Sequence, residues 1–133
     1  MAVDNIRFEW KEDFQGRMFS PNGSLPLGSD IGEMRPYHLL FGALGGCFYS
    51  TFVGIAKKKR LLFSGAKMEI SGVKREEVPT TLKEVLIKLV IMNPSNENQF
   101  LKTAELSAEH CSVHETIAKV AKIDLEVSFE YLD

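Results

Sequence analysis

Two cysteines, Cys47 and Cys111, are the residues of this chain whose type points most directly to chemistry, because a thiolate is both a nucleophile and a redox group. Cys111 lies between two predicted helices, where backbone amides at the start of the second helix could stabilise a thiolate. His110 and His114 bracket Cys111 and could lower its pKa further or carry protons. Cys47 lies on the apolar stripe of a long predicted helix, directly after two glycines, and would need a nearby cation to ionise. The residues by themselves leave open which cysteine reacts, or whether both are small buried hydrophobes.

Metal binding is a second chemistry that these residue types could support. His110, Cys111 and His114, together with His38, are side chains that bind zinc or copper. Their spacing matches no standard zinc finger, and the chain has no Cys-x-x-Cys pair. It also has neither a Gly-x-x-x-x-Gly-Lys-Ser/Thr phosphate-binding loop nor a serine nucleophile elbow. We therefore predict a protein that uses no metal and no cofactor.

The composition predicts one ordinary globular domain. The chain has 133 residues, of which 44% are hydrophobic and 26% charged, so we expect a single domain over residues 1–133 and exclude an intrinsically disordered chain. Sixteen basic and eighteen acidic residues give a net charge of −2, which argues against a nucleic-acid-binding protein. We interpret the basic run 57–60 as a solvated helix end, since cations are favourable at the carboxyl end of a helix.

We expect a cytoplasmic protein. Three charged residues among the first ten, Asp4, Arg7 and Glu9, predict that no signal peptide precedes the domain. The weakly charged run 36–56 contains polar residues and several glycines, which favour a buried helix over a membrane span. In a reducing compartment both cysteines are expected to be thiols, because cytosolic disulfides are usually transient, catalytic or redox-sensing.

Hydrophobic periodicity predicts the elements that position the two cysteines. Period-two patterns predict strands near 6–11, 68–73 and 123–131. The turn chemistry of residues 20–23 predicts short flanking strands near 17–19 and 24–27, and a nearly continuous run of Val, Ile and Leu predicts a strand over 82–92. Helical periodicity predicts helices over 36–60, 97–109 and 113–121. Four glycines in the first helix predict that a neighbouring backbone packs very close to it: Gly42, Gly45, Gly46 and Gly54. Because strands and helices come in separate runs, we expect an α+β fold whose helices cover one face of an antiparallel sheet.

Two segments carry a resemblance to a known family. Residues 36–47 read PYHLLFGALGGC, which resembles the helix motif Pro-x-x-Leu-Leu-x-x-Ala-x-Gly-x-Cys of the OsmC/Ohr family, the osmotically inducible and organic hydroperoxide resistance proteins. Residues 109–114 read EHCSVH, which is similar to that family's second motif, a cysteine followed by Pro or Ser, then Val and His or Ser. The 64-residue step between the two cysteines also fits, and the resemblance covers essentially the whole chain.

The resemblance implies both an architecture and an activity. It implies an OsmC-like α+β fold, with antiparallel sheets wrapped around long central helices in an intertwined homodimer. It also implies a peroxidase for small organic hydroperoxides, in which Cys47 attacks the peroxide and Cys111 resolves the sulfenic acid into a disulfide. A dithiol would serve as reductant, and neither nucleic acid nor membrane is an expected partner. Three aromatic residues beside Cys47 would favour an alkyl substrate: Phe48, Tyr49 and Phe52.

The chain departs from the family pattern at two positions. The family's hydroperoxide reductases activate the first cysteine with an arginine in the amino-terminal hairpin and a glutamate early in the long helix. Phe14 and Tyr37 occupy the matching positions here. Arg17 could supply the missing cation, and His114 the polar partner. The alternative function is a catalytically weak or inactive dimer that binds a small apolar or thiol-reactive ligand.

Overall fold

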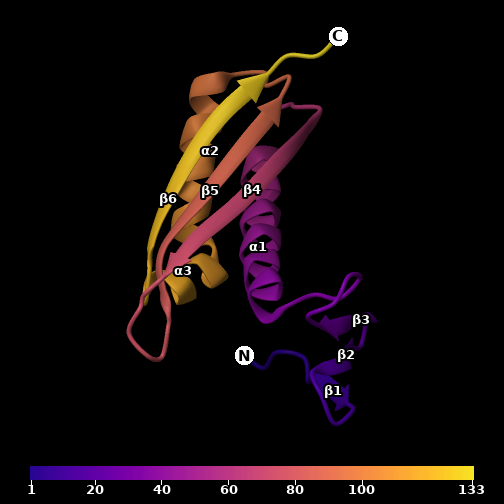
Figure 1. The fold of residues 1–133 in the computed structure, drawn as a ribbon. Coiled ribbons are helices and arrows are strands. Elements are labelled where there is room, and N and C mark those ends of the chain that lie inside the picture. The colour runs from indigo at the N-terminus through magenta and orange to yellow at the C-terminus, as the bar shows by residue number, and fades with distance from the viewer. The chain divides into compact units, whose positions relative to one another are not determined.

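The computed structural model describes all residues from 1 to 133 and contains six strands and three helices (Figure 1). In chain order they are β1 (Arg7–Trp10), β2 (Gln15–Ser20), β3 (Gly23–Gly28), α1 (Pro36–Lys58), β4 (Gly65–Lys74), β5 (Leu82–Met92), α2 (Glu97–His110), α3 (Ser112–Ala118) and β6 (Lys122–Glu130). Every predicted strand and helix is present, and the boundaries of β5 agree with the sequence pattern. The protein is therefore of the α+β class, as predicted.

Contacts along the chain define two compact units, Met1–Gly42 and Ala43–Asp133. Helix α1 begins in the first unit and continues into the second. Each unit is described by itself below. The division into two contact units does not decide whether residues 1–133 form a single domain, which stays a prediction.

The first unit is a three-stranded antiparallel meander in the order β1-β2-β3. A tight turn joins β2 to β3, and the Ser20 hydroxyl closes it by accepting hydrogen bonds from the amides of Asn22 and Gly23, both at 3.2 Å. The turn has the sequence Ser-Pro-Asn-Gly, whose Asn-Gly pair favours a tight hairpin, and it fixes the register that pairs Ser20 with Gly23.

One face of this meander is apolar and substantially exposed within the chain. Phe8 and Trp10 stack with ring centroids 6.1 Å apart, and Phe14 stacks on Trp10 at 5.4 Å. Each of the three side chains is between 44% and 47% exposed. On the other face, the Arg7 guanidinium lies over the Phe19 ring, 4.2 Å from its centroid. Three stacked aromatic rings at one sheet edge form a surface that a further protein layer could cover.

The second unit contains a sheet in the order β4-β5-β6. Strands β4 and β5 form an antiparallel hairpin, whereas β6 pairs in parallel with β5, from Glu84 beside Lys122 to Met92 beside Glu130. The sheet was expected to be antiparallel, and that expectation is wrong for the parallel β5–β6 pair. Its cause is the connection, because a chain that crosses over through α2 and α3 returns to the sheet in the same direction.

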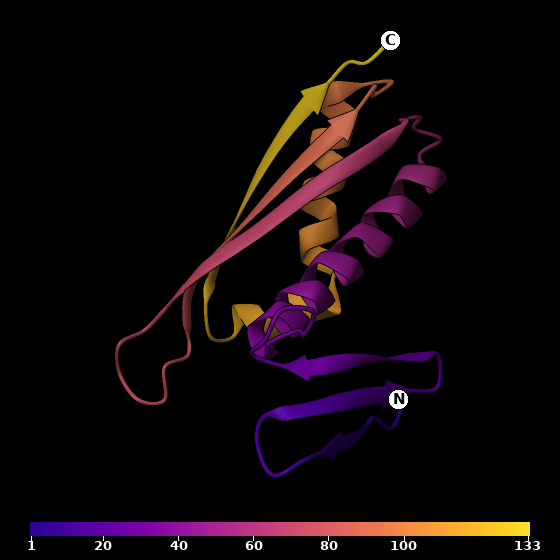
Figure 2. The same cartoon turned by 45° about the vertical axis from the view of Figure 1, so that its right-hand side comes forward.

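The helices of the second unit lie on one side of this sheet (Figure 2). Strand β5 alternates strictly over its second half, and it buries Val85, Ile87, Leu89 and Ile91 against the helices. Phe52 of α1, Phe63 and Phe100 of α2 form an aromatic cluster with centroid distances of 5.4 to 5.9 Å. Such side chains each contribute roughly 1.5–3 kcal/mol when fully buried, so this layer holds α1 and α2 to the sheet.

Helix α1 has two different long faces. Its buried residues recur at four-residue intervals: Leu44, Phe48, Phe52 and Ala56. A Cβ atom added at Gly45 would touch the side chains of Ile70 and Met68 of β4, whereas a Cβ atom added at Gly42, Gly46 or Gly54 would meet nothing within 4 Å. Inside the chain Gly45 is thus approached by side chains, and the predicted close approach of a neighbouring backbone stays a prediction. By length and composition alone α1 could also cross a membrane, a test that core helices of soluble proteins pass as well.

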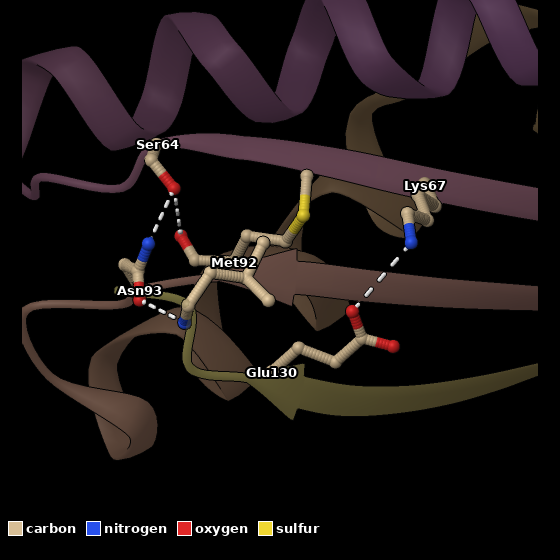
Figure 3. A network of polar contacts seen from close by, with 6 residues as sticks. Ser64, Lys67, Met92, Asn93 and Glu130 are labelled. Atoms are coloured by element: carbon tan, nitrogen blue, oxygen red, sulfur yellow. Dashed lines mark hydrogen bonds and ion pairs between the residues drawn. The ribbon is translucent and has the colours of Figure 1, made fainter.

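A polar network at one end of the second sheet joins three strands (Figure 3). Asn93 is its centre, because its side-chain amide donates to the Ser64 hydroxyl at 2.8 Å and its side-chain oxygen accepts from the Leu132 amide at 2.8 Å. Its backbone amide donates to the Glu130 carbonyl, also at 2.8 Å. Asn93 has a φ of 52°, a left-handed conformation that asparagine tolerates better than most residues. One residue thus closes the turn after β5 and ties down the ends of β4 and β6.

We predict that Asn93→Gly lowers the free energy of unfolding by about 1–2 kcal/mol, because two side-chain hydrogen bonds are lost. Asn93→Ala should cost about 1 kcal/mol more, because alanine is strained at positive φ and glycine is not. Urea unfolding at fixed protein concentration measures both values. Asn98→Ala, an exposed asparagine on α2, serves as the control and should change stability by less than about 0.5 kcal/mol. Equal losses for the glycine and alanine variants would contradict the role of backbone strain.

Candidate active site

Cys47 lies in the middle of α1, at the edge of its buried stripe. Its neighbour Phe48 is fully buried, whereas Cys47 itself is half-buried and open to small molecules. The cysteine follows Gly45 and Gly46, and the first of these packs on β4. Phe48 and Phe52 were expected to favour an alkyl substrate, but both are 0% exposed and belong to the core.

Cys111 is the single residue at which α2 ends and α3 begins. Its amide donates to the Ser107 carbonyl at 2.9 Å, which closes α2, and its sulfur accepts from the His114 amide at 3.4 Å, which caps α3. The backbone of Cys111 is extended, with φ of −80° and ψ of 115°, so the helix axis changes direction there. Only 1% of the residue is exposed. The cysteine therefore performs the capping task that serine or asparagine usually performs, and its sulfur is held in a fixed position.

The fold brings the two cysteines together. The Cys111 thiol lies close enough to the Cys47 sulfur to lower the pKa of Cys47, and the Ser112 hydroxyl lies 3.9 Å from that sulfur. Burial raises the pKa of Cys47, but hydrogen bonds from the Cys111 thiol, from the Val113 amide and from the hydroxyl and amide of Ser112 outweigh it. The net effect is a Cys47 pKa below its ordinary value, because these hydrogen bonds favour the thiolate.

Cys111 is shifted in the opposite direction. Burial raises the pKa of Cys111, and so does the neighbouring Cys47, while the amides of His114 and Val113 lower it by less. The expectation that amides of the second helix act on Cys111 is met, yet burial outweighs them. The same turn of α3 also supplies amides to Cys47, which the sequence did not indicate. Of the two neighbouring thiols, Cys47 is therefore the more acidic, and Cys111 is the one that keeps its proton to higher pH.

The histidines have separate environments. His114 is half-buried on α3, and desolvation lowers the pKa of its imidazole despite the nearby Glu115 carboxylate. Its backbone amide, rather than its ring, is the group that contacts Cys111. His110 is the exposed last residue of α2, and the Nδ1 atom of His38 accepts a hydrogen bond from the Arg35 amide at the start of α1. No group of three or more His, Cys, Asp or Glu side chains is placed to hold a metal ion.

The remaining predicted site residues belong to the first unit. Arg17 lies on β2 and donates to the Ser24 hydroxyl at 2.9 Å, across the pairing with β3. Phe14 belongs to the stacked aromatic surface, and the ring of Tyr37 meets Phe41 edge-on at a centroid distance of 6.4 Å. The predicted action of Arg17 on Cys47 stays a prediction.

Ser112 is the site residue that sequence reasoning missed. Ser112 entered the expectations from sequence only as part of the motif at residues 109–114, yet the structure places its hydroxyl 3.9 Å from the Cys47 sulfur. Its place in the sequence could have indicated this role, because a residue that directly follows a helix-capping cysteine is the first residue of the next helix and lies beside the cap.

A model of the family described as OsmC-like protein matches residues 28–126. A comparison with curated proteins finds no match to the chain. Among solved structures, a hypothetical protein from Aquifex aeolicus VF5 is 23% identical, with a TM-score of 0.90 and coverage of 100% of both chains. An OsmC like protein from Mycoplasma pneumoniae is 19% identical, with a TM-score of 0.86 over 96% of this chain and 97% of that one.

A third solved structure is that of an organic hydroperoxide resistance protein OsmC from Legionella pneumophila, which is described as a predicted redox protein. It is 17% identical to this chain, with a TM-score of 0.76 over 96% of this chain and 98% of that one. At these identities the structural likeness shows the fold. The family model covers most of the chain and both cysteines, so this chain belongs to the OsmC-like protein family.

Proposed function

We propose that this protein is a thiol-dependent peroxidase that reduces organic hydroperoxides through Cys47 and Cys111. The observation that carries the proposal is the contact between two thiols whose pKa values are displaced in opposite directions. A peroxide-reducing pair needs one sulfur that is readily ionised and a second that keeps its proton until it is used. Membership of the OsmC-like family, and the likeness to a hydroperoxide resistance protein, support the same function.

The first step uses the Cys47 thiolate. Its sulfur attacks the terminal oxygen of the hydroperoxide, the O–O bond breaks, and the alkoxide leaves and takes a proton from water to become an alcohol. The products are a Cys47 sulfenic acid and the alcohol, so the sulfur is oxidised and the peroxide is reduced by two electrons. Half-burial of Cys47 leaves the sulfur accessible to the peroxide.

The second step uses Cys111. Its thiol condenses with the sulfenic acid, which forms the disulfide and releases one water. The interaction between the two thiols supports this step, because it requires the sulfur atoms that are to be joined to lie near each other. An external dithiol then returns both cysteines to thiols by exchange, and it enters at Cys47 because Cys111 is 1% exposed.

We also propose a homodimer. Gly46, Ser50 and Gly54 recur at four-residue intervals on α1, and all three are exposed within the chain. A row of small residues lets a second helix approach closely. The stacked aromatic surface around Trp10 supports the proposal independently, because it is apolar and uncovered. A second copy of this chain is the partner that would cover both.

We predict that Cys47→Ser loses dithiol-dependent consumption of cumene hydroperoxide by more than about 100-fold, because a serine hydroxyl is not ionised near neutral pH. The rate of peroxide loss, with a small dithiol as reductant, measures the effect. Ser50→Ala, which removes an exposed hydroxyl one turn further along α1, is the matched control and should keep the wild-type rate. Equal rates for Cys47→Ser and wild type would remove Cys47 from the mechanism and favour a ligand-binding dimer.

A single equivalent of hydroperoxide should convert wild type into an internally bridged chain that has lost two hydrogens. The Cys111→Ser variant should instead accumulate sulfenic or further oxidised Cys47, because no second thiol can resolve it. Intact-mass and peptide mass spectrometry under non-reducing conditions distinguish these products. Survival of both thiols, with oxidation confined to some of the five methionines, would contradict the proposal.

Gly54→Leu should convert the dimer into a folded monomer. Within the chain, a Cβ atom added at this position meets nothing within 4 Å, so the leucine starts from an open face of α1 and extends toward the proposed partner. Light scattering should give about twice 14.9 kDa for wild type and 14.9 kDa for the variant, with unchanged circular dichroism. Ser71→Leu adds the same side chain at an exposed position of β4 and should leave the mass unchanged. A monomeric wild type would exclude the homodimer.

A further inference from the structure

The hydroxyl of Ser112 has one protein partner in this structure, the sulfur of Cys47. The two atoms are 3.9 Å apart, and either could act as donor while Cys47 is a thiol. A thiolate has no proton and can only accept, so the hydroxyl must be the donor once Cys47 ionises. The contact therefore changes character with the charge on the sulfur, and it is stronger in the ionised state because hydrogen bonds to charged groups are stronger.

The position of Ser112 is fixed from both sides. Before it, Cys111 is held by its own amide to the Ser107 carbonyl at 2.9 Å. After it, the Thr116 hydroxyl donates to the Ser112 carbonyl at 3.0 Å, and the Glu115 amide donates to the Cys111 carbonyl at 3.0 Å. The backbone that carries the hydroxyl is therefore set by two helices, and the donor needs no rearrangement to meet the sulfur.

We propose that Ser112 is a positioning residue for Cys47, whose hydroxyl donates a hydrogen bond to the sulfur whenever that sulfur is a thiolate. In the peroxidase reaction, on which the catalytic consequence of this inference rests, the hydroxyl keeps Cys47 ionised and aims its sulfur before the peroxide arrives. Ser112 then takes part of the role that a cation would otherwise have at this thiol.

The other groups around Cys47 do not conflict with the role proposed for Ser112. The titratable neighbour of Cys47 is Cys111, whose thiol also lowers the pKa of Cys47. On α3 the charged and titratable side chains are His114 and Glu115, which interact with each other and, in the case of Glu115, with Lys119. The side chains of β4 that pack on the same turn of α1, at Gly45, are the uncharged Ile70 and Met68. The remaining donors are backbone amides, which side-chain substitutions leave in place.

The test is the pH dependence of Cys47 alkylation by iodoacetamide, followed by mass spectrometry of the peptide that contains this cysteine. Ser112→Ala should move the midpoint of the profile to higher pH and lower the rate below the midpoint about threefold, as expected for one hydrogen bond of ordinary strength. The plateau at high pH should be kept, because every Cys47 is then ionised. Ser112→Thr retains the hydroxyl and should restore the wild-type midpoint. Ser128→Ala removes an exposed hydroxyl on β6 and should not move it.

An unmoved midpoint in Ser112→Ala would overturn the inference, and so would an equal shift in Ser128→Ala. A rate that falls by the same factor at every pH would also overturn it, because that result indicates altered access to Cys47 rather than a lost hydrogen bond. Peroxide consumption by wild type is measured separately with cumene hydroperoxide and dithiol. If wild type consumes no peroxide while Ser112→Ala still shifts the alkylation midpoint, the peroxidase proposal fails and the role of Ser112 stands.

Discussion

The site depends on the change of direction between α2 and α3, which a single cysteine both makes and occupies. Cys111 closes α2 with its amide and caps α3 with its sulfur. A sulfur that serves as a cap is held by its helix, so its distance from Cys47 is set by backbone geometry rather than by a flexible side chain. The same turn places Ser112 and Val113 as donors to Cys47. Without this break, α2 would continue past α1 and neither cysteine would acquire its present pKa.

The sheet and core explain why the break lies beside α1. The parallel pairing of β6 with β5 requires a crossover, and α2 and α3 provide it on the face of the sheet that α1 also covers. The aromatic cluster of Phe52, Phe63 and Phe100 holds the two long helices to that face. At the opposite end of the strands, Asn93 ties β4, β5 and β6 together through three hydrogen bonds. Packing of the helices thus determines the meeting of two residues that are 64 positions apart in the sequence.

The electrostatics of the second unit rely on hydrogen bonds rather than on ion pairs. The groups that lower the pKa of Cys47 are a thiol, a hydroxyl and two amides, all of them uncharged. Fixed dipoles of this kind stabilise an anion without the cost of burying a countercharge. The ion pairs of this unit are solvent-exposed, such as Lys119 with Glu115 on α3 and Lys67 with Glu130 on the sheet. Exposed pairs contribute at most about 1 kcal/mol each, so they have little effect on the site.

Local patterns determined the secondary structure of this protein, because periodicity and turn chemistry act over a few residues. The nearly continuous Val, Ile and Leu run in Leu82–Met92 and the glycine-bearing stripe of Pro36–Lys58 were sufficient to place β5 and α1. Motif spacing also singled out Cys47 and Cys111 and led to the family. Only the tertiary structure decided that β6 runs parallel to β5, that Phe48 is core, and that amides after Cys111 serve Cys47. Those features depend on contacts between segments far apart in the chain. At each thiol, burial raises the pKa and backbone hydrogen bonds lower it, and a local sequence pattern does not indicate which effect is larger.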